Sequence, residues 1–159
     1  MSAYALIVSL LLLAHSTTSR AQEKPDFSGE WTLNRQASSL SPAAAGMQSG
    51  TVRIEHREPM FRYAATLITG GTPIEYAYEL STDGTEVATT QQGRRSVSSL
   101  RWDGNALVFV AKVESPDPDR AITINFRYEL AEGGRRLRAV EQLRGVGRDQ
   151  DNVWIFDRR

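Results

Sequence analysis

Polar and apolar residues alternate along short segments through most of this chain. In residues 51–57, for example, Val52, Ile54 and His56 alternate with charged or polar side chains. Successive side chains of a β-strand point to opposite faces, so this pattern predicts a strand with one buried face and one face in water. The same alternation recurs in residues 73–80 and 122–129.

Ten strand-like segments follow one another, each bounded by Gly, Pro, Asn or Asp. Ser81-Thr82-Asp83-Gly84 predicts a hairpin turn, because Asp-Gly supplies the positive φ that tight hairpins need. Only the looser stretch 36–49 has room for one or two helical turns. The spacing predicts an all-β antiparallel barrel or sandwich of 8–10 strands in up-and-down order. The segments are 27–34, 51–57, 61–69, 73–80, 85–91, 95–102, 107–113, 122–129, 137–143 and 153–156.

The first 21 residues differ from the rest and predict an export signal. The apolar run from Ala5 to Ala14 is too short for a membrane-spanning helix, which needs about 20 residues. It fits the apolar region of a secretory signal, with small residues at Ser19 and Ala21 before a cleavage point. The competing interpretation is a buried N-terminal helix, because the first four residues contain no Lys or Arg. We expect export to the periplasm or the extracellular space, no transmembrane segment, and one domain over residues 22–159.

Charge and cysteine content narrow the classes of function. Arg20 is the only charged side chain of the expected signal, so the remainder carries 18 basic and 19 acidic residues. A nucleic-acid-binding domain should show a basic excess, so we expect no nucleic-acid partner. The chain has no cysteine, and burial and sheet hydrogen bonds must therefore hold it without disulfides.

The opening Phe27-x-Gly29-x-Trp31 resembles the start of proteins in the lipocalin and fatty-acid-binding-protein superfamily. More closely, the chain is similar to small exported bacterial lipocalin-like proteins, which share Trp102-Asp103-Gly104-x-x-Leu107 and a C-terminal Phe156-Asp157-Arg158. The resemblance covers residues 26–159 and implies a single up-and-down barrel.

In lipocalins the tryptophan closes the base of the barrel and often packs under a late arginine. The resemblance therefore implies structural roles for Gly29 and Trp31, with Arg158 or Arg144 as the arginine. Fatty-acid-binding proteins instead grip a carboxylate with a late Arg-x-Tyr under two lid helices. This chain departs from both features, since its last strand reads Trp154-Ile155-Phe156-Asp157-Arg158.

A set of aromatic side chains is expected to point into the barrel. In a small barrel such residues fill the core, whereas in a ten-stranded barrel they line a cavity in which tyrosine hydroxyls orient a ligand. The set consists of Tyr63, Tyr76, Tyr78, Phe126 and Tyr128.

Arg62 and Arg101 lie on segments that alternate less cleanly. Pointing inward, they would anchor a carboxylate or phosphate and make the ligand anionic; the alternative is that they face solvent. His56 is expected in the interior wall, with a catalytic base as the competing interpretation. One histidine beyond the signal and no cysteine predict no metal site, and we expect no cofactor.

We therefore expect a barrel that binds a small apolar or amphipathic molecule in its interior. The alternative is a filled barrel that acts through its outer surface as an inhibitor or interaction module. The interior would contain a void, and the ligand-binding interpretation would be favoured, if the small side chains of Ala65, Ala77 and Ala111 point inward. A third interpretation, an isomerase or hydrolase in the barrel mouth, needs an acid–base pair that the sequence does not display, so enzymatic activity is not our expectation.

Overall fold

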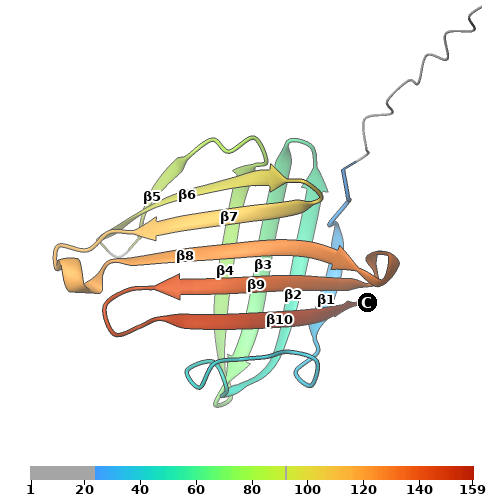
Figure 1. Ribbon diagram of the computed structural model, residues 1–159, viewed down its shortest axis with the longest axis horizontal. Coiled ribbons are helices and arrows are strands. Elements are labelled where there is room, and N and C mark those ends of the chain that lie inside the picture. Colours follow the sequence, from blue (N-terminus) through green and yellow to red (C-terminus); the bar gives the residue numbers. More distant parts are fainter. Residues whose placement is uncertain (1–23, 92) are drawn as a thin grey trace, which may run out of the picture.

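The computed structural model describes residues 24–91 and 93–159. The expected export signal lies outside the described residues. The described chain forms ten antiparallel strands in one sheet that curls into a nearly closed barrel, so the predicted fold class is confirmed (Figure 1). The strands are β1 (Gly29–Leu33), β2 (Met47–Arg57), β3 (Met60–Thr69), β4 (Thr72–Ser81), β5 (Val87–Gln91), β6 (Arg94–Asp103), β7 (Ala106–Val113), β8 (Ile122–Ala131), β9 (Arg136–Arg144) and β10 (Gln150–Arg158).

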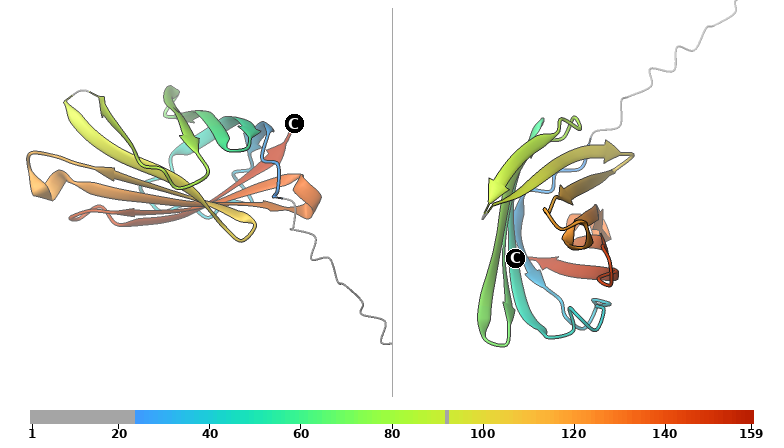
Figure 2. Two further views of the ribbon diagram at one scale, coloured as in Figure 1. Left: turned by 90° about the horizontal axis from the view of Figure 1, so that it is seen from above. Right: turned by 90° about the vertical axis from the view of Figure 1, so that its left-hand side faces the viewer.

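Strand order follows the chain except at one place. The order is β4-β3-β2-β1-β10-β9-β8-β7-β6-β5, so pairing of β1 with β10 joins the two halves of the barrel. In Figures 1 and 2 the strands β2 to β4 form one layer and β6 to β10 cross in front of it. The interior lies between these two layers.

The predicted hairpin at Ser81–Gly84 is wrong. Strands β4 and β5 do not pair and are the two edges of the sheet. Gly84 does adopt a positive φ of 88°, but its N–H donates to the carbonyl of Leu100, and Asp83 bridges to Arg101. The turn therefore carries the chain across to β6 and leaves the barrel wall unpaired between β4 and β5.

The stretch before β2 forms turns in place of lid helices. It is tied to the last strand by a backbone bridge between Ser39 and Val153, and Leu40 and Ala44 pack on the core. Pro42 and Gly46 keep these turns from continuing as a helix. The two helices of the described chain are single 3₁₀ turns, η1 (Pro118–Arg120) and η2 (Glu132–Gly134), and neither is long and apolar enough to span a membrane.

The two ends of the barrel differ in packing. We call the end with the β2–β3, β6–β7 and β8–β9 turns the closed end, and the opposite end, with residues 34–46 and the β9–β10 loop, the loop end. At the closed end the inward side chains Phe61, Leu100, Leu107 and Leu137 are completely buried. The hydrophobic core therefore fills this half of the barrel.

Candidate functional site

A layer of aromatic rings crosses the middle of the interior. Tyr78 stacks between Tyr63 and Phe109, with ring centroids 5.0 and 4.7 Å away, and so joins β3 and β4 to β7. On β8, Phe126 and Tyr128 stack at 5.5 Å, and the Tyr78 hydroxyl donates to the Tyr128 hydroxyl at 3.2 Å. This layer, which includes four of the five predicted aromatic residues, forms the floor of whatever space remains above it.

Between this floor and the loop end, inward side chains keep contact with solvent. Tyr76 pairs with Ala65 and shares the inward register of Tyr78, yet it is 53% exposed. Leu67, Ile124 and Leu143 also occupy inward positions and are half-buried. Inward residues that remain accessible define an interior surface, and the unpaired edges of β4 and β5 lie beside it.

Glu141 is the acidic side chain of this surface. It follows Leu137 and Ala139 in the inward register of β9, opposite Phe126 of β8. Its Oε2 atom accepts hydrogen bonds from Asn152 Nδ2 at 2.9 Å and from Trp154 Nε1 at 2.7 Å. The carboxylate is thus held in a fixed position on the wall of the interior.

Asn152 is itself fixed by the loop end. It is 2% exposed, and its Oδ1 accepts a hydrogen bond from the backbone N–H of Ser41 at 2.7 Å. Both halves of the amide are therefore used, one toward the turns that precede β2 and one toward Glu141. Buried polar groups paired in this way hold a single geometry.

The tyrosines near Glu141 are held neutral. Burial raises the pKa of Tyr63, and the negative charge of Glu141 raises it further. The same two causes raise the pKa of Tyr76, and burial raises the pKa of Tyr128 well above its usual value. At neutral pH these hydroxyls remain able to donate hydrogen bonds into the interior.

His56 lies at the closed end, away from Glu141 along the barrel. Its Nδ1 accepts from the Phe27 N–H at 3.3 Å, so in the neutral ring Nε2 carries the proton and donates to Glu58 at 2.8 Å. Glu58 also accepts from Thr82 and Trp102. Because the His56 side chain is only 4% exposed, this cluster ties together the closed end and offers no accessible base.

Arg62 and Arg101 point outward, so the expectation that they anchor a ligand inside is wrong. Arg62 pairs in register with Glu55 of β2 and Glu79 of β4 and forms ion pairs with both. Arg101 is exposed, whereas its neighbour Leu100 is buried in the interior. Of the three alanines whose inward placement would leave a void, Ala65 and Ala111 lie inside, whereas Ala77 is exposed on the outer face.

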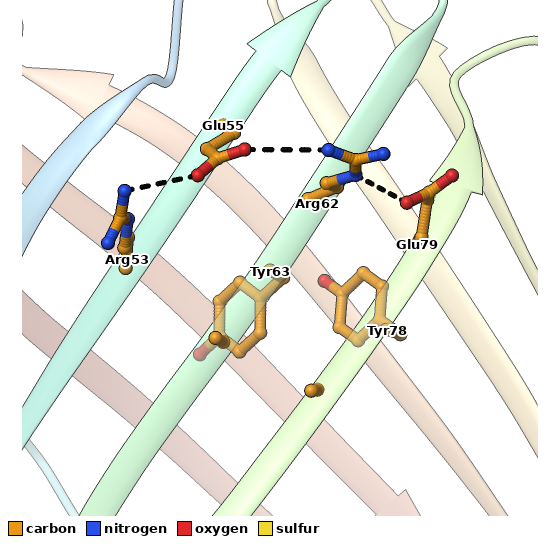
Figure 3. Close-up of a pocket in the computed structure, with 8 residues that line it drawn as sticks. Arg53, Glu55, Arg62, Tyr63, Tyr78 and Glu79 are labelled. Atoms are coloured by element: carbon orange, nitrogen blue, oxygen red, sulfur yellow. Dashed lines mark hydrogen bonds and ion pairs between the residues drawn. The ribbon is translucent and has the colours of Figure 1, made fainter.

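A shallow hollow of about 430 Å³ lies on the outer face of β2, β3 and β4. Figure 3 shows four of its residues joined in a row by ion pairs, Arg53 to Glu55, Glu55 to Arg62, and Arg62 to Glu79. Each charge in this row already has an opposite charge beside it. Such exposed pairs are worth little energetically, and they leave little charge to attract a partner.

The residues for which the resemblance implied structural roles, Gly29, Trp31 and Arg158, lie at the closed end. Trp31 is fully buried, and the structure places Arg158 over its ring, whereas Arg144 pairs with Asp151 at the other end of β9. Gly29, with a φ of 145°, lies directly beside the Arg158 side chain.

Sequence reasoning missed Glu141 and Glu58. The available signal for Glu141 was an acidic residue in the apolar register of Leu137, Ala139 and Leu143. Glu58 lies in the turn between β2 and β3, where its position gave no such signal. Among residues 24–91 and 93–159, no three His, Cys, Asp or Glu side chains come together to hold a metal ion.

Comparison with known proteins supports the fold. The chain is similar to secretory abundant heat soluble protein 4 of Ramazzottius varieornatus, with 16% identity, a TM-score of 0.55, and 87% of this chain and 99% of that one covered. It is also similar to the zebrafish ileal bile acid-binding protein in complex with cholic acid, with 11% identity, a TM-score of 0.54, and 84% and 98% covered. No protein-family model and no curated protein sequence matches it. These likenesses place the chain among barrels of the fatty-acid-binding-protein and lipocalin type by fold alone.

Proposed function

We propose that this protein binds and carries a small apolar or amphipathic molecule in the loop-end half of its barrel, as an exported protein. The observation that carries the proposal is solvent contact at four inward positions, namely the exposed Tyr76 and the half-buried Leu67, Ile124 and Leu143. An inward apolar surface that water reaches gains free energy when a ligand covers it, roughly 25 cal/mol for each Å². The mechanism is sequestration by burial, without a chemical step.

The structural neighbours are consistent with this proposal. The zebrafish protein of the same fold is a bile acid-binding protein, solved with cholic acid. Its ligand is not carried over to this chain, since the likeness is one of fold. It supports only the general idea that a barrel of this fold can bind an amphipathic molecule.

Two adjacent serines of β6 offer a matched test. Ser98 pairs with Ala111 and faces inward, whereas Ser99 pairs with Val110 and faces outward, and both are half-buried. Ser98→Trp would fill the interior surface, and Ser99→Trp adds the same ring to the opposite face.

The experiment is native mass spectrometry of the protein purified from its source, before and after denaturation, with a thermal-shift panel of lipids and small amphiphiles. We expect an added mass that denaturation releases, and ligand-dependent stabilisation that Ser98→Trp abolishes and Ser99→Trp preserves. A ligand-free mass, together with no stabilisation by the panel, would overturn the proposal and favour the alternative of a filled barrel that acts through its surface.

A further inference from the structure

Few charged side chains of the described chain point into the barrel, and they lie at different heights along its axis. By register, the charged or titratable side chains of the described strands that face inward, tyrosines aside, are His56, Arg94, Glu141 and Arg158. His56 and Arg158 are at the closed end, where they contact Glu58 and Trp31 respectively. Arg94 is exposed where β6 begins, and no described ion pair joins it to Glu141. Glu141 is therefore the one carboxylate that faces inward from the described strands.

Hydrogen bonds fix the position of the Glu141 side chain, but no positively charged group in the described part of the chain pairs with it. Its two hydrogen bonds come from neutral donors, Asn152 and Trp154, and both go to Oε2. Among the described residues, no cation forms an ion pair with it, and its other oxygen accepts no hydrogen bond. A half-buried carboxylate without a countercharge attracts a cation more strongly than an exposed one, because water screens it less.

The surroundings of Glu141 also suit a cation. Burial raises the pKa of Tyr63 and of Tyr76, and the nearby negative charge of Glu141 adds to this rise. Cations are also attracted to the faces of tyrosine rings. A ligand carboxylate at the same place would meet a like charge.

From this geometry we infer that the ligand is an amphipathic amine, with its protonated nitrogen at Glu141 and its apolar body on the aromatic floor. The inference rests on the proposed function and names the ligand class of the same site. It excludes fatty acids as the preferred ligands, even though the barrel is of the fatty-acid-binding type. It also replaces the anionic ligand that inward arginines would have implied.

The test compares three ligands with one chain and three head groups, namely n-decylamine, 1-decanol and decanoate, at neutral pH and below their critical micelle concentrations. Binding is measured by titration calorimetry, and its stoichiometry by native mass spectrometry. We expect decylamine to bind roughly tenfold or more tightly than decanol, because a charge-assisted hydrogen bond is worth more than a neutral one, and decanoate to bind most weakly.

The matched variants are Glu141→Gln and Glu75→Gln. Gln at 141 keeps an oxygen that can accept from Asn152 and Trp154, so it removes the charge and little else, and Glu75 lies exposed on the outward register of β4. Glu141→Gln should reduce the preference for decylamine over decanol to about threefold or less, and Glu75→Gln should leave it unchanged. If Glu141→Gln does not fold, the order of the three ligands on the native protein decides.

The experiment distinguishes failure of the amine inference from failure of the proposed function. Decanoate binding as tightly as decylamine, with both blocked by Ser98→Trp, would overturn the amine inference and leave the interior site standing. If other members of the lipid panel bind but no decyl ligand does, the amine inference also fails alone. No binding by any ligand would overturn the proposed function and the inference together.

Discussion

The guanidinium of Arg158 lies over the indole of Trp31, with its central carbon 4.2 Å from the ring centroid. Its Nη1 donates to the Ser28 carbonyl at 2.6 Å and its Nε to the Gly134 carbonyl at 2.8 Å. One side chain of β10 therefore ties the start of β1 to the β8–β9 turn. This arrangement closes the barrel at the end opposite the accessible interior.

Gly29→Ala should destabilise the fold by about 2 kcal/mol, because two penalties coincide there. A Cβ at Gly29 would lie 2.6 Å from Arg158 Nη1, and the φ of 145° is rarely adopted by residues with a side chain. The measurement is the free energy of unfolding in urea. The control is Gly104→Ala, where φ is also positive, at 61°, but a Cβ meets nothing within 4 Å. If both variants lose the same free energy of unfolding, contact with Arg158 is not the reason why position 29 requires glycine.

Glu58→Gln should make stability less dependent on acid pH. Burial acts to raise the pKa of Glu58, but hydrogen bonds from Thr82, His56 and Trp102 together outweigh it, and the pKa is lowered. A carboxyl whose folded pKa is below its unfolded value of about 4.3 stabilises the fold above that value. This contribution is lost as pH falls through the folded pKa.

We therefore expect Glu58→Gln to be less stable than the native protein near neutral pH, with the gap narrowing as the pH falls below about 4. Urea unfolding across this range measures it, and Glu75→Gln is the control for losing an exposed carboxylate. A gap that stays constant with pH would mean that the Glu58 charge contributes nothing to the closed end.

The strands were predictable because alternation is a local signal, but partner choice and register are not local. Arg62 could not be placed from sequence, since small side chains such as Ala64 and Ala65 occupy both faces of β3 and blur the pattern. The pairing of Arg62 with Glu55 and Glu79 decides that it faces outward.

Glu141 was missed for a related reason. Its partners Asn152 and Trp154 are on the next strand, and only the register of β9 with β10 brings them to the carboxylate. The Asp83-Gly84 hairpin failed because a turn signal fixes backbone shape without fixing which strands then pair.

Raising the pH should leave three tyrosines un-ionised until the fold is lost. Burial raises the pKa of Tyr63, Tyr78 and Tyr128, so the folded state keeps protons that the unfolded state releases near pH 10. The stability that this provides is present below about pH 10 and is lost as the pH rises toward the folded pKa values.

Absorbance at 295 nm, followed together with circular dichroism, checks this. We expect the phenolate signal of these three residues to rise in step with loss of the strand signal, whereas protein in guanidinium should titrate near pH 10 throughout. Full ionisation near pH 10 with an intact strand signal would show that water reaches the aromatic floor freely.

Arg62→Ala should leave interior binding unchanged, within about twofold, and should leave the free energy of unfolding nearly unchanged. The Arg62 side chain is 62% exposed, and its ion pairs with Glu55 and Glu79 lie on the outer face (Figure 3). Tyr76→Ala is the contrasting variant, because it removes a ring from the accessible interior. Decylamine titrations of both variants, with urea unfolding as the check on folding, should show weaker binding for Tyr76→Ala alone. If instead Arg62→Ala weakens binding and Tyr76→Ala does not, the ligand occupies the outer hollow, and the interior is not the binding site.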